Sequence, residues 1–395
     1  MLIAVIADDL TGAADTGVQL VRAGYRTAVA FRGSPLPPDG DMDAVAVETD
    51  SRSMPAGFAA RRVVEAAHAV RGADVVYKKI DSTLRGPVAA ELSAALGATG
   101  REKAIVAPAF PAAGRTTKDG VQTVRGVPVH ETEARNDPRT PVREGHLPTL
   151  LEEVGPVASL GVDALGDRGA VRRALAGARC VVADVEDEAD LEALVRAVPD
   201  PSAVLWTGSA GLALAFGRVY PGPRADGPSR AHRPARCVLV VVGSLSGASR
   251  GQLRRLAEEH GAVPVPVGRP GAMEEAVCAA REMLREGRHA AVYSPEDRGG
   301  ADAGAVVEAL AGVVKRLSEE GLFDALVLTG GDTAVGVARR LGASGIRLLG
   351  EVGAGIPVGT LVGPRPYTVV TKAGGFGEDG TLVNVLQALS RCGED

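Results

Sequence analysis

The densest group of chemically active side chains lies in the nine residues from Lys78 to Gly86. These residues read Lys-Lys-Ile-Asp-Ser-Thr-Leu-Arg-Gly and hold three cations, one carboxylate and two hydroxyls. The group follows an apolar run and precedes Pro87, which is typical of a strand that ends in a loop before a helix. A turn alone needs one such group rather than six. The composition therefore favours recognition of a small, polyhydroxylated anion.

Two adjacent carboxylates, Asp8 and Asp9, follow the first apolar segment of the chain. Carboxylates between a buried strand and a helix are costly unless they bind a hydroxyl, a cation or helix N–H groups. Asp9 or Thr11 could simply cap the helix, and one aspartate could do so while the other contacts a ligand. A further polar group, residues 48–52, follows the third predicted strand. Its Arg52 could grip a carboxylate through its planar fork or lie in solvent.

Two glycine-containing turns in the C-terminal part follow buried apolar runs. They are Gly243-Ser244-Leu245-Ser246 after 238–242 and Gly330-Gly331-Asp332-Thr333 after 325–329, and a helical pattern follows each. The free N–H groups and the dipole of a helix that begins after such a turn form an anion site. Two of them favour a bound polyphosphate, with a nucleotide first among the candidates. The alternative is two ordinary turns that use Gly and Ser for conformation alone.

Several nucleotide and hydrolase patterns are not matched. No stretch fits the phosphate-binding pattern G-x-x-x-x-G-K-[ST]. Gly353-Ala354-Gly355 superficially suggests a dinucleotide fingerprint, but Pro357 falls inside the expected helix and Gly359 comes one residue late. The six histidines avoid these motifs, so a Ser–His hydrolase built on Ser244 is disfavoured.

The predicted elements alternate between strands and helices. Strands are expected at 2–7, 27–31, 44–48, 75–80, 104–107, 237–242, 290–294, 325–329 and 368–371, and helices at 12–23, 56–70, 87–96, 252–260 and 334–341. Such alternation predicts mostly parallel sheets covered by helices, with ligands at the carboxyl ends of the strands. Residues 110–145 show little periodicity and many Gly, Pro and charged residues. A segment of this kind is typically a substrate-binding lid, and its stretch 108–120 could close over a ligand or lie solvated.

Residues 221–235 hold four prolines and no apolar periodicity, so they are the predicted linker. They divide the 395 residues into a substrate-binding domain, 1–220, and a nucleotide-binding domain, 236–395. The expected fold class is α/β, with two α/β domains, each a mostly parallel sheet flanked by helices. We expect the active site in the cleft between them.

The overall composition limits the partners and the compartment. The formal net charge of −5 and the absence of a basic tract argue against nucleic-acid binding. No apolar run is long enough to span a membrane, and Asp8 and Asp9 come too early for a signal peptide. The four cysteines are scattered without a CxxC pair. We therefore expect a cytoplasmic protein with small-molecule ligands, and the sequence leaves a homodimer open.

Taken in order, several of these motifs resemble those of the four-carbon acid sugar kinases. The motifs that carry the resemblance are residues 8–15 (Asp-Asp-Leu-Thr-Gly-Ala-Ala-Asp), 79–86, 330–334 and 371–377. They extend over nearly the whole chain. In that family the N-terminal domain binds a sugar acid and the C-terminal domain binds ATP, and this order matches the division drawn from charge and glycine placement.

The resemblance implies a role for individual residues of this sequence. It assigns substrate binding to Asp9, Arg52, Lys79, Ile80, Asp81 and Ser82, and ATP binding to Ser244, Gly330, Gly331, Asp332, Thr333 and Gly374. We expect Arg52, Lys79 and Arg85 to hold the substrate carboxylate, and Asp9 and Asp81 to accept hydroxyl hydrogen bonds. Asp9 is the candidate catalytic base. Asp332 is the candidate ligand of Mg²⁺, directly or through water, and Lys372 is expected to assist the glycine loops.

The expected activity is ATP-dependent phosphorylation of the terminal hydroxyl of threonate, erythronate or a 3-oxo derivative. Two other classes stay open at this point. One is a nicotinamide-dependent oxidoreductase of small hydroxy acids, which the failed dinucleotide fingerprint disfavours. The other is a non-catalytic sensor of nucleotide or sugar acid, which would lack acid-stimulated ATP turnover.

Overall fold

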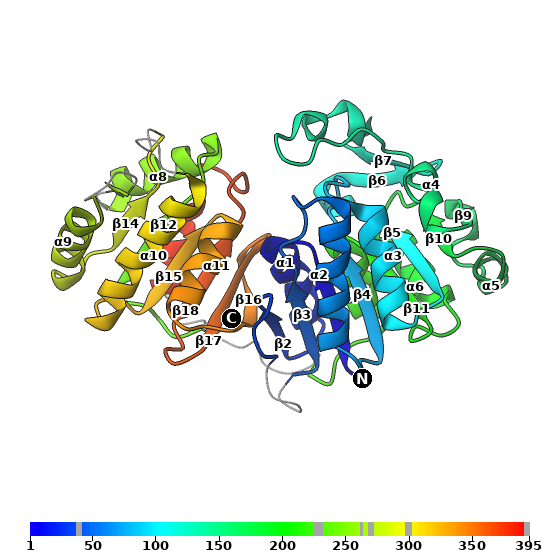
Figure 1. Ribbon diagram of the computed structural model, residues 1–395, viewed down its shortest axis with the longest axis horizontal. Helices are drawn as coiled ribbons and strands as arrows, with labels where there is room; N and C mark the ends of the chain where they lie inside the picture. The colour runs from blue at the N-terminus through cyan, green and yellow to red at the C-terminus, as the bar shows by residue number, and fades with distance from the viewer. Residues whose placement is uncertain (37–41, 225–231, 261–263, 268–271, 297–301, 391–395) are drawn as a thin grey trace. The chain divides into compact units, whose positions relative to one another are not determined.

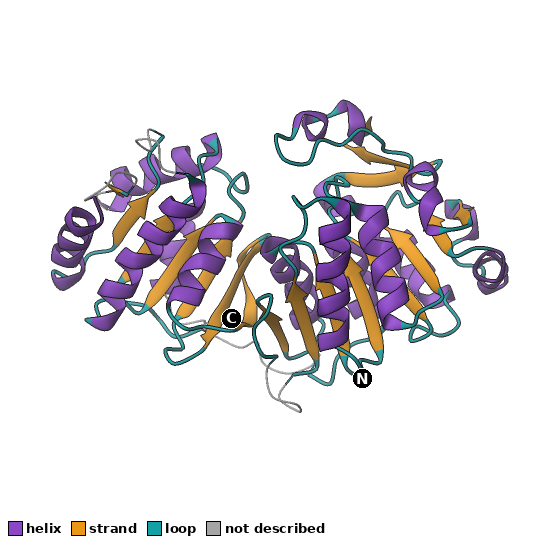
Figure 2. Ribbon diagram, viewed as in Figure 1, coloured by secondary structure: helices purple, strands orange, loops and turns teal. Residues whose placement is uncertain are grey.

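Apolar runs that follow one another along the chain form the parallel strands of two α/β units, Met1–Gly227 and Pro228–Asp395 (Figures 1 and 2). The computed structural model describes residues 1–36, 42–224, 232–260, 264–267, 272–296 and 302–390. The predicted linker at 221–235 lies partly outside these described residues. The prediction of two α/β parts, each with a mostly parallel sheet flanked by helices, is confirmed.

The first unit is built on a parallel sheet with the order β2-β3-β1-β4-β11-β5-β10-β9. Its strands are β1 (Ile3–Ala7), β2 (Thr27–Ala30), β3 (Ala44–Glu48), β4 (Val75–Lys79), β5 (Lys103–Ala107), β9 (Val157–Leu160), β10 (Cys180–Ala183) and β11 (Val204–Gly208). Strand β1 is buried at every position, as expected for a strand covered on both faces. It pairs with β3 on one side and with β4 on the other. The loops that follow these three strands therefore meet at one edge of the sheet.

Helices cover the sheet of the first unit. They are α1 (Leu10–Arg22), α2 (Ala56–Ala69), α3 (Val88–Thr99), α4 (Leu147–Leu150), α5 (Arg168–Gly177), α6 (Glu188–Ala197) and α7 (Ala210–Val219). Helices α2 and α3 lie side by side over one face, and α1 packs against α7 (Figure 1). One core joins apolar residues of β1, β4 and β5 to those of α2 and α3, such as Ile6, Val63 and Leu92. This packing fixes α3, whose first turn lies directly behind the loop after β4.

The expectation of an irregular segment at 110–145 is wrong. Strands β6 (Arg115–Lys118), β7 (Val121–Val124) and β8 (Val127–Pro128) form a small antiparallel sheet. The short 3₁₀ helices η1 (Pro111–Ala113), η2 (Val129–Glu131) and η3 (Glu133–Asn136) flank it, and η4 (Glu152–Val154) and η5 (Val162–Ala164) follow. The tip between β6 and β7 is fastened because the N–H groups of Asp119 and Gly120 donate to the Asp184 carboxylate. Polar strands in a sheet this short lack the apolar alternation that reveals a strand in sequence.

The second unit has the strand order β13-β14-β12-β15-β18-β17-β16. Its strands are β12 (Val238–Val242), β13 (Pro264–Pro266), β14 (Ala290–Tyr293), β15 (Ala325–Thr329), β16 (Gly345–Gly353), β17 (Ile356–Val362) and β18 (Thr368–Lys372), and its helices are α8 (Gly247–His260), α9 (Ala272–Arg285), α10 (Ala303–Glu319), α11 (Gly331–Arg340) and α12 (Thr381–Ser390). Strands β13, β14, β12, β15 and β18 pair in parallel in that order, whereas β17 pairs antiparallel with both β18 and β16. Gly353-Ala354-Gly355 is thus a hairpin turn and not the start of a helix.

The parallel part of the second sheet brings the glycine turns together. Strand β12 lies beside β15, and β15 lies beside β18. The turns after these three strands therefore share one edge, where α8, α11 and α12 begin. No helix in the part of the chain that the structure describes is long and apolar enough to cross a membrane.

Candidate functional site

In the first unit, Arg52 joins the two aspartates that follow β1. Its Nε and Nη2 donate to Asp8 at 2.6 and 2.9 Å, and its Nη1 and Nη2 donate to Asp9 at 2.6 and 2.8 Å. Asp9 also caps α1 by accepting the N–H of Gly12 at 2.7 Å. Four of the five N–H groups of the guanidinium are used in this way, so Arg52 keeps one on Nη1. Asp9 thus fills the predicted role of helix cap and also pairs with Arg52, while its contact with a ligand stays a prediction.

The two aspartates differ in how readily they ionise. Burial opposes the charge of Asp8, but Arg52, Lys78 and Lys79 outweigh it and hold the pKa of Asp8 below its usual value. For Asp9, burial and the neighbouring Asp8 outweigh Arg52 and Lys79 and raise its pKa. Asp9 is therefore the better proton acceptor of the pair. One lone-pair position on its Oδ2 is left, because its other three accept the bonds described above.

Lys79 ends β4 and carries a buried ammonium, with only 4% of the residue exposed. Its Nζ donates to the carbonyl oxygen of Ile80 at 2.9 Å. Among the described residues no carboxylate lies within 4.0 Å of this nitrogen. Its charge nevertheless acts to lower the pKa of Asp8, Asp9 and Asp81, although for Asp9 other effects outweigh it. Two of its three N–H groups therefore stay available. Such a buried, under-used cation is suited to an anionic ligand.

Asp81 and Arg85, in the loop after β4, form a second ion pair. Arg85 donates from Nε and Nη2 to Asp81 at 2.8 and 3.1 Å, and Asp81 also accepts the N–H and hydroxyl of Thr83. Burial opposes the charge of Asp81, but Arg52, Arg85 and Lys79 hold its pKa well below the usual value. Asp81 thus orients cations and is a poor base.

The remaining predicted residues of this loop differ in what they present. The Ser82 hydroxyl makes no hydrogen bond within the described part of the chain and is partly exposed. Ile80 is buried in the core, where its N–H donates to Gly208 and its carbonyl accepts from Lys79. Ile80 therefore offers a ligand little beyond its backbone.

Two side chains that sequence reasoning missed contact this loop, one from the small antiparallel sheet and one from the residue that follows η3. Gln122 of β7, fully buried, donates from Nε2 to the carbonyl oxygen of Ser82 at 2.8 Å, while Thr117 donates to its Oε1 at 2.7 Å. Asp137 lies 3.6 Å from Nη1 of Arg85. The one sequence feature that could have located Gln122 is the Asp119-Gly120 turn, which places Gln122 opposite Thr117 in a hairpin.

In the second unit, Lys372 at the end of β18 shapes the loop that follows it. Its Nζ donates to the carbonyl oxygens of Ala373, Gly374 and Phe376 at 2.8, 3.3 and 2.8 Å. Burial lowers the pKa of this lysine to about 8. In a trans peptide the C=O and the next N–H point in opposite directions. The N–H groups of Gly374, Gly375 and Gly377 therefore point away from the ammonium, and no described residue accepts a bond from them. Outward N–H groups of this kind form an anion-binding concavity.

The turn after β12 packs directly on this loop. Ser246 and Ser249 both donate to the carbonyl oxygen of Gly374, at 2.5 and 2.6 Å. A Cβ on Gly374 would overlap the Ser244 side chain, so this position requires glycine. Ser246 and Ser249 were missed because serines three apart are usual at any helix start.

The turn after β15 completes the edge. Gly330 has a φ of 99° and precedes α11, whose first residues are Gly331, Asp332 and Thr333. Its N–H donates to the carbonyl oxygen of Lys372 at 2.9 Å, which ties this turn to the loop after β18. Thr333 is buried against Gly243 of the β12 turn. The predicted nucleotide residues Ser244, Gly330–Thr333 and Gly374 thus lie on neighbouring loops at one helix-rich edge.

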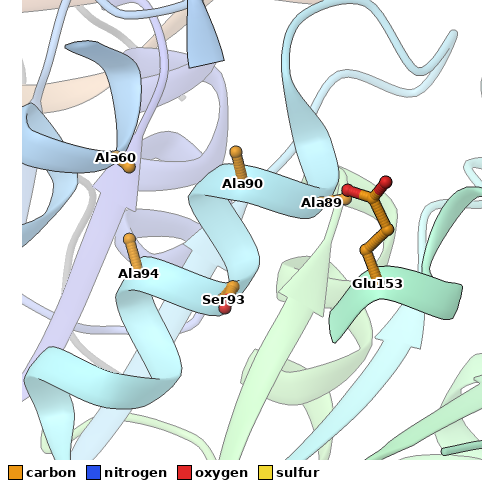
Figure 3. Close-up of a pocket in the computed structure, with 6 residues that line it drawn as sticks. All are labelled: Ala60, Ala89, Ala90, Ser93, Ala94 and Glu153. Carbon is orange, nitrogen blue, oxygen red and sulfur yellow. The ribbon is translucent and has the colours of Figure 1, made fainter. Parts of the chain in front are cut away.

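A separate hollow of about 350 Å³ opens on the flank of the first unit (Figure 3). It is lined by Ala60 of α2, by Ala89, Ala90, Ser93 and Ala94 of α3, and by Glu153 of η4. The four residues of α3 form one face of it in Figure 3. Small alanine and serine side chains make up most of its lining and one carboxylate is its only charged group, so it is no candidate for the chemistry described above.

Comparison with known proteins gives the same two parts. Residues 3–216 match the family described as "Sugar-binding N-terminal domain", and residues 239–382 match "Nucleotide-binding C-terminal domain". A D-threonate kinase of Bordetella bronchiseptica is 40% identical to this chain over 407 residues, covering 98% of this chain and 97% of that protein. This chain belongs to the four-carbon acid sugar kinase family. A D-erythronate kinase of Heliobacterium modesticaldum is 30% identical, with 98% of this chain and 97% of that protein covered.

A solved structure extends the comparison. A protein of Bordetella bronchiseptica was crystallised with bound citrate as a domain-swapped dimer; it is 38% identical, with a TM-score of 0.52 and 98% of each chain covered. Each of the four-carbon acid sugar kinase motifs quoted from the sequence begins at or next to the end of a strand, namely β1, β4, β15 and β18. In the first unit these loops join Asp9, Arg52, Lys79 and Asp81 in one cluster.

Proposed function

We propose that this protein is an ATP-dependent kinase that phosphorylates the terminal hydroxyl of a four-carbon sugar acid. The observation that carries the proposal is the buried Lys79 ammonium, which has two uncommitted N–H groups and lies in the field of Asp9. It combines a site for a carboxylate with a proton acceptor for a hydroxyl. The kinase names of the relatives support the reaction class.

On the acid side, the available donors decide the contacts. Lys79 offers two N–H groups and Arg52 one. Arg85 is bonded to Asp81, and its Nη1 lies 3.6 Å from Asp137 but donates no hydrogen bond within the described residues. We assign the substrate carboxylate to Lys79 and Arg85, and a hydroxyl to Ser82. Asp9, whose pKa burial raises, is the proposed acceptor of the proton from the attacking hydroxyl.

On the nucleotide side, the phosphates fit the outward N–H groups of Gly374 and Gly375 and the start of α11. Lys372 orders this loop from behind and is not assigned a phosphate contact. Its three donors already hold carbonyl oxygens of the loop.

The residues present also fit a magnesium ion carried by the nucleotide. Asp332 lies in the first turn of α11, and a carboxylate beside phosphates repels them unless a cation lies between. Mg²⁺ is commonly held by one or two carboxylates together with substrate phosphates, so the lack of a cluster of three or more candidate ligands in the described chain fits this mode. When bound, the ion neutralises phosphate charge.

Phosphoryl transfer requires the attacking oxygen and the γ-phosphorus to come within about 3–3.5 Å. The proposed acid site and nucleotide site lie in different units of the chain. We therefore keep the proposal of an active site in a cleft that the two units form when both ligands are bound.

An assay of ADP release with a panel of four-carbon acids tests the function. D-threonate is the first substrate to try, since the D-threonate kinase above is more similar to this chain than the D-erythronate kinase. We expect acid-dependent ADP release and a phosphorylated acid detected by mass spectrometry. Acid-dependent reduction of a nicotinamide would instead support an oxidoreductase, and binding without any turnover would support a sensor.

A further inference from the structure

Lys78 and Glu91 are deeply buried charges of the first unit that no step above uses. Lys78 Nζ lies 2.7 Å from Glu91 Oε2, and the two side chains are 0% and 3% exposed. Lys78 neighbours Lys79 at the end of β4, and Glu91 lies in the first turn of α3. The pair is thus hidden directly behind the loop that carries the proposed substrate contacts.

Each member of the pair fixes a different part of the acid site. Lys78 Nζ also donates to the carbonyl oxygen of Lys79 at 2.8 Å, while the N–H of the same peptide, that of Ile80, donates to Gly208 at 2.9 Å. The peptide plane after Lys79 is therefore held from both sides. The Lys79 ammonium in turn lies on the Ile80 carbonyl, so its position depends on this plane.

Glu91 extends the link to the loop that carries Arg52. Ser51 donates to Glu91 Oε1 at 2.6 Å, and its hydroxyl lies 2.6 Å from that of Thr49, which donates to the carbonyl oxygen of Ala7 at 2.9 Å. All of these groups are buried. One chain of contacts thus joins the ends of β1, β3 and β4 to α3.

We propose that Lys78 and Glu91 are positioning residues that hold Lys79 and Arg52 in register for the sugar acid. Stability alone does not explain a charged pair at this place, since well-packed apolar residues would serve a buried core equally well. What apolar residues cannot supply is the directed bonds to the Lys79 carbonyl and to Ser51. This inference rests on the proposed function, because it assigns a role in binding and orienting the acid.

The decisive variant replaces the pair by apolar residues of similar volume, Lys78→Met together with Glu91→Leu. Removing both charges avoids a lone buried charge, so we expect a folded protein with nearly unchanged thermal stability. We expect kcat/KM for the acid to fall by about tenfold or more, with kcat itself reduced, because small misplacements of reacting groups are costly. The affinity for ADP, measured by calorimetry, should stay at the wild-type value.

A second variant and a matched control separate the proposed link from the general effect of losing a polar contact. Ser51→Ala cuts the link to Glu91 but leaves the ion pair, and should also lower kcat/KM for the acid. The control is Asp43, which directly precedes β3 at the end of the strand opposite to Ser51. Asp43→Asn breaks its ion pair with Arg26 (2.9 Å) and should leave the kinetics unchanged. Wild-type kcat/KM in the double variant and in Ser51→Ala would overturn the inference. A wild-type protein that phosphorylates no sugar acid would instead overturn the proposed function, and the two failures are separate results.

Discussion

At the scale of single residues, the proposed acid site is a set of buried charges that are mostly paired with one another. Asp8, Asp9, Asp81 and Glu91 face Arg52, Arg85, Lys78 and Lys79. Lys79 stands apart because most of its hydrogen-bonding capacity is unused. Removal of its charge should therefore cost binding without breaking an internal ion pair.

Lys79→Met should lower kcat/KM for the acid by a factor that corresponds to about 2–4 kcal/mol, through loss of a charge-assisted contact. Lys103→Met is the matched control: its Nζ also donates to one carbonyl oxygen, that of Ala178 at 2.8 Å, but it begins β5 at the opposite end of the sheet. Steady-state kinetics and thermal melts of both variants check this. Equal kinetic losses in the two variants would contradict the assignment.

Lys372 gives a prediction in pH. Burial lowers its pKa to about 8, so above that pH the amine is neutral and has two N–H groups for three carbonyl oxygens. ADP affinity should fall by about fivefold as pH rises through this value, for the loss of roughly 1 kcal/mol of hydrogen bonding. Because the folded pKa lies below the unfolded one, the free energy of unfolding should rise between pH 8 and 10.5.

Calorimetry in buffers of different ionisation enthalpy checks the first part. ADP binding near pH 8.5 should take up a fraction of a proton, since the bound anion favours the charged amine. No proton uptake, together with an affinity that does not change from pH 7 to 9.5, would show that the Lys372 ammonium does not order the loop.

At the scale of elements, the small sheet β6-β7-β8 positions the loop after β4. Gln122→Leu removes the bond to the Ser82 carbonyl and should raise KM for the acid about fivefold or more, because a partly buried acceptor loses its partner. Thr116→Val is the control, since it loses a bond to Thr123 within the same sheet but touches no part of the loop. If both variants have the same KM, the sheet has no role in acid binding.

How far the sequence predicts this protein also depends on the element. Strands such as β3 and β15 were placed to the residue, because buried parallel strands are continuous apolar runs that end in polar turns. The same pattern indicated Asp9, Arg52, Lys79 and Gly374. The roles of Glu91 and Gln122 were not predictable, since each is a single polar residue whose partner lies 13 to 40 positions away. Hairpin β16–β17 was missed because its glycines and Pro357 obscure the alternation.

At the scale of the whole molecule, the proposed reaction requires the bound sugar acid and the bound nucleotide to meet. An open site would hydrolyse ATP without an acceptor, so closure should follow binding of both ligands. We expect small-angle scattering to show compaction with sugar acid and a non-hydrolysable ATP analogue together, and little with either alone. ATP turnover without acid should be low. Unchanged dimensions with both ligands, combined with equally fast ATP hydrolysis in the absence of acid, would rule out the closing mechanism.

The burial of Lys78, Lys79 and Lys372 has a consequence for covalent chemistry. The chain has only six lysines, and these three are at most 4% exposed. An amine-reactive acylating reagent should therefore modify Lys118, Lys315 and the terminal amine first, and Lys103 more slowly. Modification of Lys79 or Lys372 requires local opening of the structure, so its rate, followed by peptide mass spectrometry, measures how often each site becomes exposed. Sugar acid should lower the modification rate at Lys79, and nucleotide should lower it at Lys372.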